Sequence, residues 1–216
     1  MASWSPENAT KAYLRALKMG KRSKQPDIAE FISALAAGNN ARLMVMASAG
    51  VAGSTGLSLV AAAHQTGGQA VCILSAESDL YESRNALGTY ADCVKFVIGD
   101  AKTLLSNDYK EADFVLIDCK IDGCKEVLRA AQECEKHGRG LIVGYNAFHK
   151  GSWPSAFKTH FLPIGEGLMV TRIGSKVSEE GGHRKRSKWV TRVDRCTGEE
   201  HVYRVTSPLE EIEAWS

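Results

Sequence analysis

Four polar residues that could do chemistry each stand just after an apolar run of the sequence. They are Glu77, Asp100, Asp118 and Asn146. A carboxylate can accept hydrogen bonds from a ligand, or take a proton as a general base. If the apolar runs are parallel strands, their carboxyl ends meet at one edge of a sheet, where α/β proteins bind ligands. The four side chains are therefore expected to line one site, and Asp118, at the end of a buried strand, is its strongest candidate.

A glycine-rich turn precedes this set. The apolar run 43–47 is followed by three glycines and then by an alanine-rich helix over 57–64. The glycines are Gly50, Gly53 and Gly56. This order is typical of nucleotide-binding α/β domains, because glycine lets the backbone approach a ligand closely. A phosphate-binding P-loop is excluded, since Leu57 and Ser58 follow the last glycine, and a tight turn that binds nothing is the alternative.

In the rest of the chain, predicted strands alternate with predicted helices, as a parallel α/β sheet requires. Further strands are predicted over 70–74, 94–98, 114–117 and 140–143, with helices between them. Two N-terminal helices precede the sheet, the first running from the capping residue Ser5 to Gly20. We expect a Rossmann-like α/β fold with a mostly parallel sheet, helices on both faces and a closing antiparallel hairpin. The predicted parts are N-terminal helices (1–40), a Rossmann-like domain (41–173) and, extending that domain, a basic linker and β-hairpin (174–216).

Composition and charge narrow the function classes. The 216 residues are 44% hydrophobic, enough for one sizeable core, and their formal net charge of +2 does not by itself indicate nucleic acid. No apolar run is long enough to span a membrane and no secretory signal is evident, so we expect no membrane association. Six cysteines without a CxxC pair favour a reducing compartment, and the cytoplasm is the predicted location. Cys72 and Cys119 lie within or at the ends of strand-like runs and are predicted to be small core residues.

Four motifs, in their order along the chain, resemble a known family. They are TGLSL (55–59), ADFVLIDCK (112–120), GLIVGYNAFHKGS (140–152) and LPIGEGLMVTR (162–172). The set is similar to the cation-dependent O-methyltransferases, the caffeoyl-CoA and catechol group of class I S-adenosylmethionine-dependent methyltransferases. The whole chain also resembles a plant family of methyltransferase-like proteins. The resemblance covers residues 40–173 and implies a class I methyltransferase fold with S-adenosylmethionine as cofactor.

The resemblance also implies roles for individual residues. Those expected to contact the cofactor are Gly50, Gly53, Ser54, Thr55, Gly56, Glu77, Gly99, Asp100, Ala101 and Asp118. The residues expected to act on a small-molecule acceptor are Asp118, Lys120 and Asn146. Structural alternatives stay open for Glu77 as a first-turn acid, Asp100 as a helix N-cap, Asp118 as a partner of Lys120, and Asn146 as a turn residue.

The motifs depart from the family pattern where the family binds its divalent cation. The family uses an Asp after strand four and an Asp–Asn pair after strand five. Here Asp118 and Asn146 match, but Tyr145 replaces the middle carboxylate. A hard cation needs several oxygen ligands, mainly carboxylates, so no metal site is expected. The family's lysine aligns with Ile121, one residue after Lys120, and the expected activity is methylation of a small plant metabolite without a tight metal.

Two other functions remain as alternatives. The missing carboxylate and the displaced lysine favour a catalytically silent methyltransferase-fold module that binds or regulates a partner. A nicotinamide-dependent reductase is more distant, because no Tyr-x-x-x-Lys pair stands where that chemistry needs one.

The C-terminal part carries the basic run 183–188, and two strands are predicted after it, over 189–193 and 201–205. We interpret it as a solvated linker, with nuclear import or RNA contact as alternatives, which would add the nucleus as a location. Trp189 and Tyr203, with arginines beside them, would suit base stacking and phosphate contacts. The sequence leaves homodimer formation open.

Overall fold

The computed structural model describes residues 4–20, 28–133, 140–149, 159–172, 186–193 and 200–207. The chain forms two compact units, Met1–Val177 and Ser178–Ser216, and each is described by itself. The linker predicted from residue 174 to residue 182 lies outside the described residues. The prediction that the C-terminal hairpin extends the Rossmann-like domain stays a prediction.

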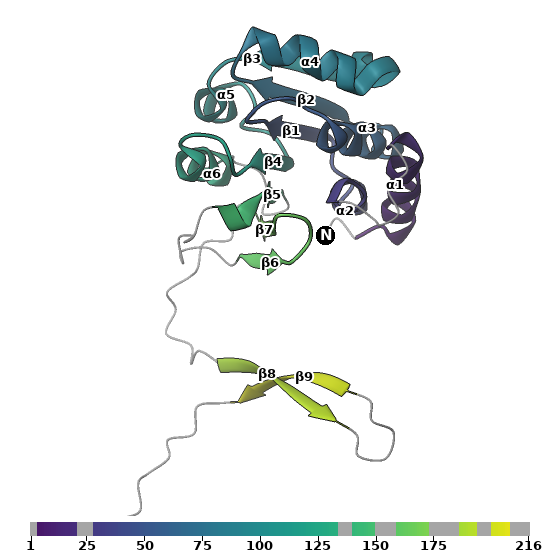
Figure 1. Ribbon diagram of the computed structural model, residues 1–216, viewed down its shortest axis with the longest axis vertical. Coiled ribbons are helices and arrows are strands. Elements are labelled where there is room, and N and C mark those ends of the chain that lie inside the picture. Colours follow the sequence, from purple (N-terminus) through teal and green to yellow (C-terminus); the bar gives the residue numbers. More distant parts are fainter. Residues whose placement is uncertain are drawn as a thin grey trace, which may run out of the picture. The chain divides into compact units, whose positions relative to one another are not determined.

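Within its described residues, the larger unit contains a seven-stranded sheet in the order β3-β2-β1-β4-β5-β7-β6 (Figure 1). The strands are β1 (Leu43–Ala47), β2 (Gln69–Leu74), β3 (Val94–Ile98), β4 (Phe114–Asp118), β5 (Leu141–Tyr145), β6 (His160–Leu162) and β7 (Leu168–Arg172). Strands β1 to β5 pair in parallel, and β7 runs antiparallel to both β5 and β6. The predicted α/β fold, with its mostly parallel sheet and closing hairpin, is confirmed.

Helices cover both faces of this sheet, as Figure 1 shows. They are α1 (Pro6–Met19), α2 (Ile28–Gly38), α3 (Ser54–Thr66) and α4 (Glu77–Leu87) on one face, α5 (Ala101–Asn107) and α6 (Cys124–Glu133) on the other, and the short 3-10 helices η1 (Gly88–Cys93) and η2 (Ala147–His149). The alternation of side chains along a strand divides the core in two. Met44 of β1 packs in one cluster with Ile32 and Leu59. Its neighbour Val45 packs in the other cluster with Leu105.

Helix α1 follows the predicted capping pattern. The Asn8 N–H donates to Ser5 Oγ at 3.2 Å, and Pro6 occupies the first turn, where its missing N–H costs nothing. The helix ends at Gly20, as expected. The buried small face of α1, with Ala12 and Ala16, lets it pack closely against α2 and α3.

Two hairpins complete the described chain. In the first, β6 and β7 pair from Leu162↔Leu168 outward, as the sequence predicts. Its turn requires glycine at position 167, which has a φ of +90° and where a Cβ would lie 2.6 Å from Phe148 Cγ. In the second unit, β8 (Arg186–Val193) pairs with β9 (Glu200–Ser207). Strand β8 begins three residues before the expected start at Trp189, so residues 186–188 of the basic run belong to the ladder; the apolar pattern alone did not reveal this.

The side chain of Asp113, the residue before β4, forms hydrogen bonds with the backbone at the beginning of β1. Its carboxylate accepts the backbone N–H groups of Arg42, at 2.9 and 3.0 Å, and of Leu43, at 3.0 Å. Burial raises the pKa of this carboxyl, and the backbone hydrogen bonds partly offset that rise.

Asp113→Ala should therefore destabilise the fold. Removing the acceptor leaves a partly buried backbone N–H without its partner, which costs about 1–3 kcal/mol of unfolding free energy. Urea unfolding measures the loss, and Asp92→Ala, at an exposed aspartate, is the control. Equal unfolding midpoints for the two variants would show that Asp113 does not hold the strands together.

The described cysteines differ in their burial. Cys72 and Cys119 are buried, as predicted for small core residues, and burial raises the pKa of the Cys72 thiol to about 12. Cys93 is exposed. None of the described helices has both the length and the apolar character needed to cross a membrane.

Candidate functional site

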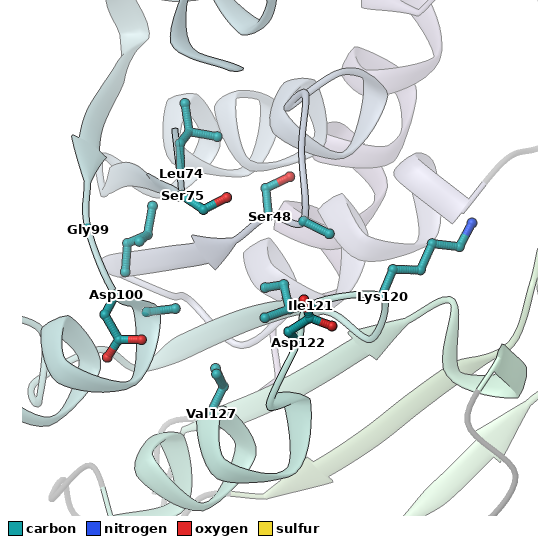
Figure 2. A pocket seen from close by; sticks show the side chains of 12 residues that line it. Ser48, Leu74, Ser75, Gly99, Asp100, Lys120, Ile121, Asp122 and Val127 are labelled. Carbon is teal, nitrogen blue, oxygen red and sulfur yellow. The ribbon is translucent and has the colours of Figure 1, made fainter. Parts of the chain in front are cut away.

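A cavity of about 250 Å³ opens at the carboxyl ends of four neighbouring strands (Figure 2). Its lining includes Ser48 after β1, Ser75 after β2, Gly99, Asp100 and Ala101 after β3, and Lys120, Ile121 and Asp122 after β4. The chain winds outward from β1 to β3 and then returns to β4 on the other side of β1. This reversal is the topological switch point at which open α/β sheets bind ligands. The cavity therefore lies where the strand order predicts a binding site.

Asp100 stands on the rim of this cavity as the N-cap of α5. Its Oδ2 accepts the Thr103 N–H at 2.7 Å and the Thr103 hydroxyl at 2.6 Å. These hydrogen bonds lower the pKa of the Asp100 carboxyl. The capping role that the sequence left open is confirmed, and it leaves the carboxylate ionised at the cavity.

Asp118 and Asn146 come together at the ends of β4 and β5. Asp118 is only 8% exposed, and its Oδ1 accepts Asn146 Nδ2 at 2.8 Å and the Lys120 backbone N–H at 3.0 Å. Asn146 adopts a φ of +57°, a conformation uncommon outside glycine. Asparagine is among the non-glycine residues that adopt this conformation most readily, so the turn role left open for Asn146 is compatible with the structure. Neither Asp118 nor Asn146 is among the described residues that line the cavity.

Tyr145 connects the carboxylate to the glycine loop. Its side chain is buried, and its phenol has the hydroxyls of Ser48 and Thr55 and the carboxylate of Asp118 as hydrogen-bonding partners. Burial, reinforced by the negative charge of Asp118, raises the pKa of the phenol. The phenol is therefore neutral and can donate to Asp118. This network joins the ends of β1, β4 and β5 with the first turn of α3.

The side chains of Asp118, Tyr145 and Asn146 do not form a suitable set of ligands for a hard divalent cation. Asp118 Oδ1 already accepts two hydrogen bonds, one of them from the Asn146 amide nitrogen. The residue that replaces the family's middle carboxylate, Tyr145, carries a neutral phenol. Such a cation needs six or more oxygen ligands, with carboxylates among them. Within the described part of the chain, no three His, Cys, Asp or Glu side chains gather as a metal site.

Lys120 lines the cavity with its stem, while its amine forms an ion pair elsewhere. Figure 2 shows the side chain extending away from Asp100. Lys120 Nζ lies 2.8 Å from Glu166 Oε2 in the turn between β6 and β7. The hydrogen bond to Glu166 is the main reason that the pKa of the lysine is raised. The pair ties the closing hairpin to the end of β4.

Lys120→Ala should leave the thermal unfolding midpoint unchanged. The two side chains are 41% and 64% exposed, and ion pairs this accessible to water add little to stability. Differential scanning calorimetry of Lys120→Ala and of Glu166→Ala tests this, with Lys125→Ala as the control. A clear fall in the midpoint for both variants, but not for the control, would show that the pair holds the hairpin in place.

The glycine-rich loop that the sequence predicts as part of the cofactor site is not part of the described cavity lining. In the described structure, that lining includes none of the loop residues Gly50, Gly53, Ser54, Thr55 and Gly56. A Cβ built on Gly50 or Gly53 would meet no atom within 4 Å, so protein packing does not require glycine there. A Cβ on Gly56 would touch Ala52 and Leu87 at ordinary distances. The open space at Gly50 and Gly53 is available to a ligand.

Glu77 is the first residue of α4, exposed, and outside the described lining of the cavity. Ser75, two residues earlier, lines the cavity instead. The sequence prediction named Glu77 rather than Ser75 as the ribose contact, and it gave no binding role to Ser48 or Tyr145. A signal for the two serines was present, since each follows directly after a predicted strand. The role of Tyr145 depends on contacts between four separate elements, which no local pattern reveals.

Comparison with known proteins gives a family and a fold. A family model described as "Protein of unknown function (DUF1442)" matches residues 1–205. No curated protein matches the chain.

Among solved structures, similar ones include a methyltransferase from Geobacter sulfurreducens, with 18% identity and a TM-score of 0.54 over 78% of this chain and 90% of that one. A methyltransferase from Podospora anserina with bound S-adenosylhomocysteine has 16% identity and a TM-score of 0.54 over 78% and 88%. An O-methyltransferase from Bacillus cereus, also in complex with S-adenosylhomocysteine, has 17% identity and a TM-score of 0.53 over 77% and 89%. This likeness shows a Rossmann-like methyltransferase fold.

Proposed function

The chain belongs to the DUF1442 family, and from that premise we propose that it binds S-adenosylmethionine and methylates a small-molecule acceptor. The observation that carries the proposal is the cavity at the ends of β1 to β4, with the buried carboxylate of Asp118 at the end of β4. Solved neighbours with this fold include two that hold S-adenosylhomocysteine. That product of methyl transfer is the ligand that the neighbours suggest for the cavity.

The nucleoside part of the ligand would occupy the cavity. Gly99, Asp100 and Ala101 would surround the adenine, with the Asp100 carboxylate accepting a hydrogen bond from its amino group. Ser75 would approach the ribose, and Glu77 would also contact it through its long side chain. The volume of about 250 Å³ is slightly below the range of whole-ligand pockets. The rest of the ligand would extend over the open backbone at Gly50 and Gly53.

S-adenosylmethionine supplies a methyl group on a sulfonium, which an acceptor oxygen or nitrogen can attack in line. The chain's own part is to position the acceptor and to take its proton. Asp118 would receive that proton on its carboxylate. The Asn146 amide and the Lys120 backbone N–H hold the carboxylate in a fixed orientation, and the Tyr145 phenol is a further hydrogen-bonding partner of it. Lys120 and Asn146 would also contact the acceptor.

Tyr145 replaces the carboxylate that a metal site would need at this position. In the proposed mechanism, Asp118 therefore takes the proton without a metal ion. A small plant metabolite with a hydroxyl or amine is the acceptor that we propose. The test is transfer of label from radioactive S-adenosylmethionine to a panel of such acceptors, with magnesium or with EDTA. Equal transfer in both conditions supports the proposal, whereas transfer that EDTA abolishes would contradict the metal-free mechanism.

A second candidate function has its own supporting observation. Asp118 Oδ1 and the Lys120 amine are both engaged by groups of the chain itself, and this suits a silent domain that needs no reactive groups. Such a module would bind S-adenosylmethionine, or a partner, without turnover. Tight cofactor binding combined with no label transfer to any acceptor in the panel would favour it over the enzyme.

A further inference from the structure

The hairpin of β8 and β9 separates its residues into two chemically different faces. The strands pair antiparallel in a continuous register from Arg186↔Ser207 to Val193↔Glu200 (Figure 1). Because successive residues of a strand belong to opposite faces, the register assigns each residue to one face or the other. The first face has residues 186, 188, 190 and 192 of β8 and 201, 203, 205 and 207 of β9. The second has the residues between them.

The first face concentrates positive charge. It has Arg186, Lys188 and Arg192 in one strand and His201 in the other, and of its eight residues none is acidic. The second face has one base, Arg204, and one acid, Glu200, whose charges cancel. It also has the apolar residues Trp189, Val193 and Val202, as the first face has Val190 and Val205. The chain's net charge of +2 therefore does not reveal that three cationic residues share one face of the hairpin.

An aromatic residue stands among the cations of the first face. Tyr203 pairs with Val190, so Lys188 and Arg192 are its diagonal neighbours in the ladder. Diagonal positions across an antiparallel pair are within reach of long and aromatic side chains. Eight strand residues extend over about 24 Å, which is long enough to follow several nucleotides of an extended strand.

We propose that this first face binds single-stranded nucleic acid. Cations spaced along a two-stranded ribbon complement a phosphate backbone, and an aromatic residue among them provides a stacking position for a base. The aromatic residue favours this occupant over an acidic protein or an anionic lipid surface, for which charge alone would suffice. The proposal is independent of the methyltransferase proposal, because it uses none of the residues at the cavity.

The experiment is fluorescence anisotropy of a labelled, mixed-sequence 20-nucleotide RNA titrated with the full chain at several salt concentrations. Three phosphate contacts predict that log K falls with log[salt] with a slope of about −2. Arg192→Ala and Arg204→Ala form a matched pair, since each removes one arginine, from the first and the second face respectively. Arg192→Ala should weaken binding and flatten the slope by about 0.7, with Arg204→Ala close to wild type. Tyr203→Leu should weaken binding by about 5- to 150-fold, and Trp189→Leu should not.

Circular dichroism of each variant checks that the fold is kept. The proposal is overturned if the RNA does not bind saturably at low salt, or if the two arginine variants have equal effects. It is also overturned if duplex RNA, or vesicles containing phosphatidylserine, bind the chain more tightly than the single strand. Cofactor titration of the same variants should be unaffected, so failure here would leave the cavity's proposed function standing.

Discussion

Asp118→Asn is expected to lower the rate of methyl transfer by about 10²- to 10⁴-fold, the usual contribution of a positioned general base. The amide cannot take the acceptor's proton. Its oxygen can still accept the hydrogen bonds that Asn146 and Lys120 donate to Asp118 Oδ1, so the fold should survive. Steady-state kinetics with an acceptor found in the panel would show the loss in kcat, with the KM for S-adenosylmethionine little changed.

The matched control for this variant is Asp108→Asn, at an exposed aspartate after α5. It makes the same chemical change outside the site and should keep wild-type kinetics. If Asp118→Asn transfers methyl groups at the wild-type rate, Asp118 has no part in proton removal. Loss of its thermal transition would instead identify a structural carboxylate.

Asp100→Ser should weaken S-adenosylmethionine binding by about 10- to 100-fold, the range for losing a hydrogen bond to a charged group. Serine is as good an N-cap as aspartate, so it should keep the cap on α5 that Asp100 now makes with the Thr103 N–H. The substitution therefore separates the carboxylate's role toward a ligand from its role in the helix. Isothermal titration calorimetry measures the change in dissociation constant.

Asp100→Ala completes this comparison. Alanine removes both the carboxylate and the cap, so this variant should lose stability as well as affinity. Equal affinity of wild type and Asp100→Ser would remove the carboxylate from the binding site. It would also leave Asp100 with the capping role alone.

The fold could be predicted because its signals are local. Apolar runs bounded by turn residues mark each parallel strand, and capping residues such as Ser5 mark helix starts. The carboxyl ends of those strands then follow from topology, so Asp100 could be assigned to the binding edge from its position after a strand. The structure places Asp100 on the cavity and brings Asp118 to Asn146.

The remaining features depend on contacts between distant parts of the chain. Lys120 reaches Glu166 across 46 positions of sequence, and Tyr145 meets residues of three other elements. No periodicity encodes such pairs. Glu77 shows a different limit, since it begins α4 and is outside the described lining of the cavity, whereas Ser75, two residues earlier, is part of that lining.

The two faces of the C-terminal hairpin lie between these cases. The even spacing of Arg186, Lys188 and Arg192 is present in the sequence, but the register of β8 against β9 determines which residues of the other strand share their face. The expected strand began at Trp189, which left Arg186 and Lys188 in the linker. The ladder adds both to the face that contains Arg192 and Tyr203.

The proposed cofactor site at the ends of β1 to β4 works without a metal. It can be tested by isothermal titration calorimetry of S-adenosylmethionine and S-adenosylhomocysteine into the full chain, with magnesium or with EDTA. We expect micromolar dissociation constants for both ligands that are the same in the two conditions. Absence of binding at millimolar ligand, or binding that requires magnesium, would contradict it.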